Sequence, residues 1–193
     1  MNRECLEEFI LQFPIYQYSF MKSEDIEFSE KVRSFCKRSC PHYRESWSCP
    51  PAVGKLEQCR DKCLKYTDVL IFSTVTEVDE KEKNIRSGET QKEHEKLTGI
   101  INSKMRDLGY ITYVISSGYC RICDKCTFPR DYCRHPEEMY PCIESHGIVV
   151  SDLIADNDMD YYMGEKLRLM FSLIFFKDTG FAFDSEKEES ADV

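Results

Sequence analysis

The sequence lacks an apolar stretch that is long enough to cross a membrane. Its segment LMFSLIFF, residues 169–176, is far shorter than the roughly 20 residues that a spanning helix needs. The N-terminal sequence MNRECLEEFI carries three acidic residues and lacks the basic, apolar and small-residue plan of a signal peptide. These two absences predict a cytoplasmic protein that does not bind a membrane.

The chain also lacks an excess of positive charge. Its 193 residues include 26 Lys and Arg against 35 Asp and Glu, which gives a net charge of −9 and an isoelectric point near 5.1. Because an acidic protein is repelled by phosphate groups, nucleic acid and anionic membranes are not expected as main partners. Residues 184–193 contain five acids and one lysine, so we expect a disordered tail over residues 181–193.

Several enzyme signatures are absent. The chain has no glycine-rich dinucleotide loop, no phosphate-binding loop and no Ser/His/Asp arrangement. Radical S-adenosylmethionine enzymes use C-x3-C-x2-C, but the C-x3-C pairs at residues 36–40 and 59–63 are followed at the required place by Tyr43 and Tyr66. A haem attachment motif would need histidine where Thr127 stands. The sequence therefore leaves open whether the protein is an enzyme.

Cysteine, by contrast, is abundant. The chain has 11, and without an export signal they indicate metal binding or redox work rather than a disulfide framework. Residues 119–136, YCRICDKCTFPRDYCRHP, contain four of them: Cys120, Cys123, Cys126 and Cys133. Their neighbours are largely charged, whereas cysteines that pack as small apolar side chains have apolar neighbours. We interpret this stretch as a metal site.

The spacing within this stretch favours an iron–sulfur cluster. It resembles the bacterial ferredoxin run, C-x2-C-x2-C with a fourth cysteine and a proline, although the last gap is six residues rather than three. Three cysteines at two-residue gaps suit the separate corners of a cube. Structural zinc sites more often use two separate C-x2-C knuckles, and zinc is kept as the alternative metal.

A second cysteine-rich segment, residues 36–66, supplies thiols for a second site: Cys36, Cys40 and Cys49. Prolines and a glycine place the last two of these in loops. The spacing leaves the fourth ligand open among Cys59, Cys63, Cys142 and, as in two-cluster ferredoxins, Cys133. If none of these binds, one iron is open to a small molecule and the site becomes catalytic.

Basic side chains accompany this second segment. Eight Lys and Arg lie between residues 33 and 65 against three Asp and Glu, in a chain that is acidic overall. Cations near thiols favour the thiolate and stabilise an anionic cluster, and we prefer this interpretation to a merely solvated surface. Trp47, close to Cys49, is expected to shield the site. The nearby histidines are expected at the surface or behind the ligands: His42, His135 and His146.

The apolar pattern predicts a single α+β domain over residues 1–180, with a small mixed sheet of about four strands, helices packed on it and cysteine-rich loops forming the metal-binding side. Strands are expected at residues 16–21, 68–76, 110–116 and 166–176, the last of them paired with 161–163. Helices are expected near the N-terminus and at residues 29–35, 55–66, 89–108 and 137–146. The order strand, helix, strand suggests a right-handed crossover between parallel strands.

These motifs together resemble a family of predicted metal-binding proteins, domain of unknown function 2284. The resemblance rests on W-x-C-P-P at residues 47–51, on the cysteine run that ends in C-R-H-P at 133–136, and on I-E-S-H-G-I-V-V at 143–150. It covers most of residues 30–176, and it favours a short helix at 148–155, where the apolar content by itself also fits a strand. It implies metal binding, and iron–sulfur binding in particular, at seven cysteines: Cys36, Cys40, Cys49, Cys120, Cys123, Cys126 and Cys133.

The resemblance implies no reaction, and it leaves the site of Cys36, Cys40 and Cys49 short of a thiolate. At Cys142 the chain departs from the family, which tends to have serine there, and Cys59 and Cys63 lie outside the shared pattern. Our leading hypothesis is an iron–sulfur protein with one or two 4Fe–4S clusters that transfers electrons with a redox partner protein, or delivers a cluster to a redox enzyme. The alternatives are an enzyme with an open iron at residues 36–49 and a zinc-stabilised interaction module.

Overall fold

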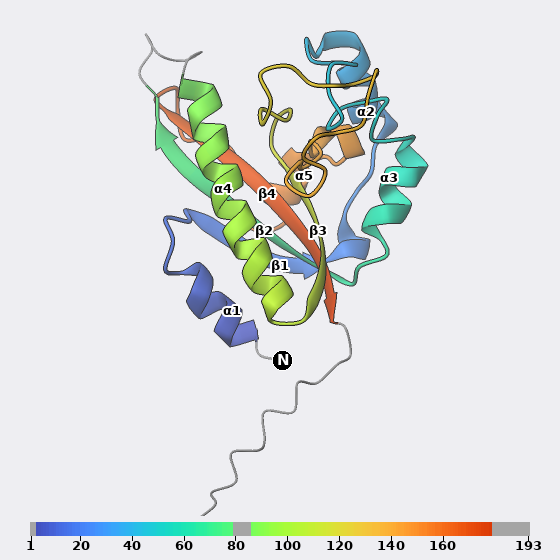
Figure 1. Cartoon of the computed structure of the whole chain (residues 1–193). Coiled ribbons are helices and arrows are strands. Elements are labelled where there is room, and N and C mark those ends of the chain that lie inside the picture. The colour runs from blue at the N-terminus through green and yellow to red at the C-terminus, as the bar shows by residue number, and fades with distance from the viewer. Residues whose placement is uncertain (1–2, 79–85, 179–193) are drawn as a thin grey trace, which may run out of the picture.

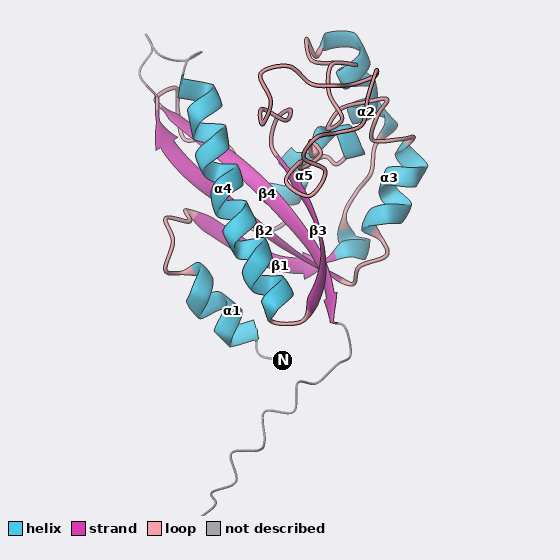
Figure 2. Ribbon diagram, in the orientation of Figure 1, coloured by secondary structure: helices cyan, strands magenta, loops and turns pink. Residues whose placement is uncertain are grey.

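The computed structural model describes residues 3–78 and 86–178, which form a four-stranded sheet with helices packed on it (Figure 1, Figure 2). The helices are α1 (Arg3–Ile10), α2 (Glu30–Ser39), α3 (Leu56–Cys63), α4 (Arg86–Asp107) and α5 (Val150–Ala155). The strands are β1 (Gln17–Lys22), β2 (Asp68–Glu77), β3 (Tyr110–Ser116) and β4 (Leu167–Asp178). Short 3-10 helices lie at η1 (Ser23–Asp25) and η3 (Glu144–His146). The predicted α+β class is confirmed.

The sheet is antiparallel at every pairing, in the order β1-β2-β4-β3. The prediction of a mixed sheet is therefore wrong, whereas the predicted connection between two parallel strands is present, from β2 through α4 to β3. β2 and β3 do run in the same direction, but β4 lies between them and pairs with both. Residues 170–176 of β4 are all buried, and an inner position gives such a strand hydrogen-bond partners on both edges. The expected pairing of 166–176 with 161–163 is wrong for the same reason.

Side chains of the strands alternate between two apolar cores, as the twofold repeat of a strand requires. Leu70 and Phe72 of β2 face the core that α1 and α4 cover (Figure 1). Val69 and Ile71 face the other core, to which α3 and α5 contribute. The two cores therefore lie on opposite faces of the sheet. The cysteine-bearing loops lie beyond the end of β3 (Figure 1).

Most predicted helices form where the sequence placed them. α2 begins after Ser29, whose Oγ accepts a hydrogen bond from the Lys31 amide at 3.3 Å. α4 ends just before Gly109, whose φ of 86° suits glycine at the end of a helix. The segment 150–155 forms α5, as the family resemblance favoured.

The helix expected over residues 137–146 does not form, and only η3 at its end is helical. Pro141 cannot donate an amide hydrogen bond within a helix. Its carbonyl instead accepts a hydrogen bond from the Ser116 amide at 2.9 Å, and Ser116 forms a parallel bridge with Cys142. This segment is therefore tied to the end of β3, which decides the geometry of the site described below.

The tail that was expected to be disordered, residues 181–193, lies outside the described residues. Within residues 3–78 and 86–178, no helix is both long enough and apolar enough to cross a membrane. All 11 cysteines fall inside this part of the chain.

Candidate metal centre

The cysteines are all free thiols, and the seven that were predicted as metal ligands line two cavities. The first cavity is lined by Cys36, Cys40 and Cys49. The second cavity is lined by Cys120, Cys123, Cys126 and Cys133. Each of the two groups of cysteines that the spacing predicts therefore lines one cavity of its own. Metal binding by each of these residues stays a prediction.

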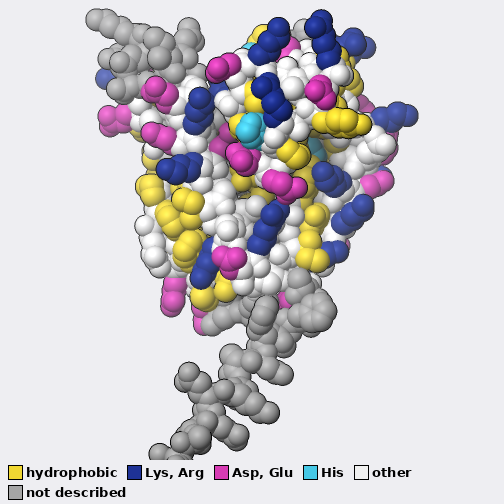
Figure 3. Space-filling model, viewed as in Figure 1, with side chains coloured by type: hydrophobic (Ala, Val, Ile, Leu, Met, Phe, Trp, Pro, Cys, Tyr) yellow, Lys and Arg dark blue, Asp and Glu magenta, His cyan; other side chains and the backbone are white. Residues whose placement is uncertain are grey.

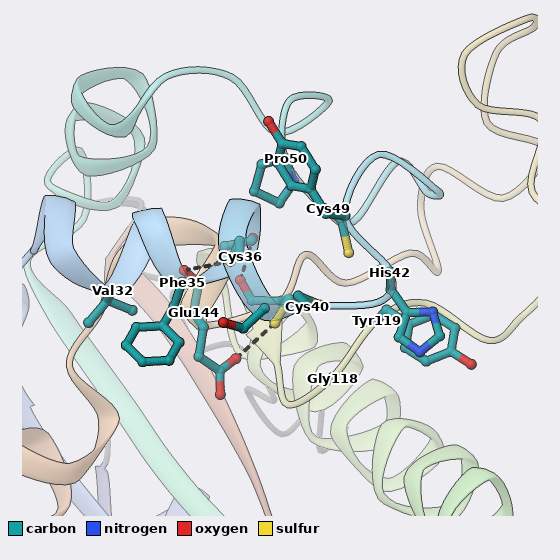
Figure 4. Close-up of a pocket in the computed structure, with 14 residues that line it drawn as sticks. Val32, Phe35, Cys36, Cys40, His42, Cys49, Pro50, Gly118, Tyr119 and Glu144 are labelled. Carbon is teal, nitrogen blue, oxygen red and sulfur yellow. Dashed lines mark hydrogen bonds between the residues drawn. The ribbon is translucent and has the colours of Figure 1, made fainter.

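The first cavity has a volume of about 470 Å³ and lies between α2 and the loops that follow α2 and β3 (Figure 4). Cys36 lies in the second half of α2 and Cys40 ends this helix, so that a four-residue spacing puts both on one face. Cys49 reaches the cavity from the turns that follow. Side chains of Phe35 and Tyr119 contribute to its walls (Figure 4).

Two groups that the spacing did not assign to this site also line the first cavity, namely Cys142 and Glu144. The Cys142 Sγ donates a hydrogen bond to Glu144 Oε2 at 2.8 Å, and the Cys36 Sγ donates to the main-chain oxygen of Glu144 at 3.8 Å (Figure 4). Cys142 was one of four candidates for a fourth ligand. Glu144 was not predicted, although it belongs to the I-E-S-H-G-I-V-V motif that supports the family resemblance.

Burial favours the protonated form of three thiols that line the first cavity: Cys36, Cys49 and Cys142. It raises the pKa of Cys36 to about 11 and also raises the pKa of Cys49, although hydrogen bonds from Ser46 and Ser48 act against the second shift. Burial and then the Glu144 carboxylate raise the pKa of the Cys142 thiol well above its ordinary value. A metal bound here must therefore displace protons, so its affinity would rise with pH.

The second cavity is much smaller, about 20 Å³, and one loop supplies all four of its cysteines. Thr127 organises this loop: its Oγ1 donates to the Tyr132 carbonyl at 2.7 Å, and its own carbonyl accepts from the Arg130 amide at 2.9 Å. Burial raises the pKa of Cys120 to about 11. His135 lines the same cavity.

The segment Ser46–Cys49 joins the two cavities. The Ser48 Oγ accepts a hydrogen bond from the Cys120 amide at 2.9 Å, and the Ser48 carbonyl accepts from the Cys142 amide at 3.1 Å. The Trp47 Nε1 donates to the Asp131 carbonyl at 3.2 Å, and its side chain lines the second cavity. Trp47 therefore covers the second site rather than the first, although it was expected to shield the cysteine next to it in sequence.

The remaining cysteines lie elsewhere. Cys59 is 1% exposed and its Sγ donates to the Val53 carbonyl at 3.4 Å, outside both cavities. Cys63 is fully buried in the core that α3 and α5 share. Cys5 is exposed on α1. These three positions do not bring a thiol to either site.

The cysteines of each cavity offer thiols, which are ligands for both zinc and iron–sulfur clusters. Within residues 3–78 and 86–178, no three or more His, Cys, Asp or Glu side chains converge closely enough to hold one metal ion. The sulfurs instead stand around the walls of the two cavities. Iron–sulfur clusters are held by cysteines at separate corners, so their ligands need not converge on a single point.

Comparison with known proteins agrees with the motifs. No curated protein and no solved structure is significantly similar to the chain. Residues 19–176, which include both cavities and the whole sheet except part of β1 and the end of β4, match a family described as predicted metal-binding protein, DUF2284. The chain belongs to this family.

Proposed function

We propose that the protein binds one or two 4Fe–4S clusters and transfers electrons with a redox partner protein, or delivers a cluster to a redox enzyme. The observation that carries this proposal is the second cavity, where one loop sets four cysteines around one space. Four thiolates are the usual ligand set of a 4Fe–4S cluster. A cluster bound there would supply one-electron redox chemistry, and the loop would have to widen its cavity of about 20 Å³ to hold it.

The closeness of the two cavities supports electron transfer. Trp47 lines the second cavity and Cys49 lines the first, and two residues of extended chain span at most about 7 Å. Ser48 between them is fully buried and hydrogen-bonded to both sides. Groups held in both cavities would therefore be neighbours in a rigid frame with little water between them.

Anaerobic reconstitution of the full chain with ferrous iron and sulfide tests this proposal. We expect a brown protein with broad absorption near ~400 nm and about four to eight irons per chain. A colourless protein that holds stoichiometric zinc, and takes up no iron under these conditions, would contradict it and favour the zinc-stabilised interaction module.

The enzyme hypothesis is supported by a separate observation, the size of the first cavity. Its volume of about 470 Å³ falls within the range of small-molecule sites. A cluster with three protein ligands there would leave room for a small molecule at the fourth corner. This alternative depends on which residue, if any, supplies the fourth ligand.

A basic surface around the cavities supports a partner of acidic character. The end of α2 from residue 36, together with the loops at residues 40–49 and 119–136, carries seven Lys and Arg against three Asp and Glu, whereas the whole chain has a net charge of −9. Six of these basic side chains are exposed: Lys37, Arg38, Arg44, Lys125, Arg130 and Arg134. Figure 3 shows Lys and Arg side chains over this end of the molecule. Tyr132, in the same loops, is 87% exposed and adds an aromatic contact of the kind that anchors interfaces.

We expect this surface to speed electron transfer to an acidic plant-type ferredoxin. Stopped-flow rates of the reconstituted protein should fall about tenfold between low and high salt, because screening removes long-range attraction. The double variant Lys37→Glu/Arg130→Glu should show a similar fall at low salt. Lys166→Glu, an exposed position outside these loops, serves as the control and should keep the rate. An unchanged rate in the double variant would rule out docking at this surface.

A further inference from the structure

The sequence left four cysteines as candidates for a fourth ligand at the first cavity, and the structure separates them. Cys133 lines the second cavity with the other three cysteines of its loop. Cys59 and Cys63 are buried residues of α3 and do not line the first cavity. Cys142 does line it, together with the three predicted ligands.

The backbone of Cys142 is fixed from two directions. Its amide donates to the Ser48 carbonyl at 3.1 Å, which places it next to the turn that presents Cys49. On its other side Cys142 forms a bridge with Ser116 at the end of β3, and the Ile143 amide donates to the Ser116 carbonyl at 3.1 Å. These hydrogen bonds fix the backbone of Cys142, so its side chain is presented to the cavity by a rigid segment rather than by a free loop.

The thiols of Cys142 and Cys36 both donate hydrogen bonds to the same residue, Glu144. Glu144 accepts a hydrogen bond from the Cys142 thiol with its carboxylate, and one from the Cys36 thiol with its main-chain oxygen. Both sulfurs therefore lie on the same side of the first cavity. The Glu144 side chain is exposed, so its carboxylate can turn toward solvent when the Cys142 thiol gives up its proton.

We propose that Cys142 is the fourth thiolate ligand of a 4Fe–4S cluster in the first cavity, an inference that rests on the proposed function. Ligation forms a bond between the Cys142 sulfur and one iron, and the thiol proton leaves to solvent. The ligand set is then Cys36, Cys40, Cys49 and Cys142. With all four corners held by protein, this site has no open iron, which favours electron transfer over the enzyme hypothesis.

The experiment compares wild type, Cys142→Ala, Cys142→Ser and Cys59→Ala after anaerobic reconstitution. We expect the wild type to hold about eight irons and to keep them during brief treatment with ferricyanide. Cys142→Ala leaves one iron without a thiolate, so it should lose about one iron per chain and show the electron paramagnetic resonance signal of a 3Fe–4S cluster. Cys59→Ala removes a buried thiol outside the cavities and should behave as wild type.

The readouts separate a lost ligand from a damaged fold. The cluster of the second cavity should remain in every variant, and Cys142→Ser keeps the side-chain volume while replacing the thiolate, so it should change the spectrum without unfolding the chain. A Cys142→Ala variant that keeps all its iron and gives no 3Fe–4S signal would overturn the inference. The inference would also be overturned if the wild type held about four irons and lost all of them when the cysteines of the second cavity were replaced. That result would still agree with iron–sulfur binding by the protein. A wild type without iron would instead contradict the proposed function.

Discussion

Replacing Cys123 and Cys126 together with alanine is expected to halve the iron content of the reconstituted protein, from about eight atoms to about four. These residues line the second cavity, and two thiols are too few to hold a cluster there. Replacing Cys36 and Cys40 should likewise remove about four irons, this time from the first cavity. Iron and sulfide assays with absorption spectra measure both losses.

The control for this experiment is the double variant Cys5→Ala/Cys59→Ala, which removes two thiols from outside the cavities and should keep all the iron. If Cys36→Ala/Cys40→Ala left the iron content unchanged, the first cavity would not be a metal site. If either pair of substitutions removed all the iron, the two cavities would hold one joint centre rather than two independent ones.

Replacing Gly147 with alanine is expected to destabilise the metal-free protein by about 2–4 kcal/mol. Gly147 ends η3 with a φ of 75°, a conformation that side chains disfavour. A Cβ atom there would also lie 3.0 Å from the Ser29 carbonyl oxygen and would collide with the Leu56 side chain. Leu56 can rotate away, but the Ser29 main chain is held by a hydrogen bond from its amide to the Gly147 carbonyl at 2.7 Å.

Urea unfolding measures this loss, and Gly164→Ala is the matched control. Gly164 also has a positive φ, 92°, but nothing lies within 4 Å of a Cβ atom at that position. Its replacement should cost only the backbone strain, about 1 kcal/mol. Equal losses in the two variants would show that contacts around Gly147 add nothing to the strain. Because Gly147 follows Glu144 and Cys142 closely, its variant should also weaken iron binding in the first cavity.

Local rules predict much of this fold. The apolar face that ends at Gly109 predicts α4, and the cap at Ser29 predicts the start of α2, because both depend on residues close in sequence. The place of β4 between β2 and β3 was not predictable in this way. The position of β4 depends on which strand edges pair with each other. Pairing between strands that are distant in sequence cannot be predicted from the local apolar pattern of either strand. The helix wrongly expected over residues 137–146 shows the same limit, since a bridge to β3 overrides local helical preference there.

The sequence by itself grouped three cysteines in each segment, because short spacings such as those from Cys120 to Cys126 confine the thiols to one neighbourhood whatever the rest of the chain does. Only the tertiary structure decided that the two groups adjoin through Trp47 and Ser48, and that Cys142 joins Cys36 rather than the run that precedes it. Those contacts depend on hydrogen bonds across roughly a hundred residues, and such bonds exist only once β3 and the turns after α2 are packed together.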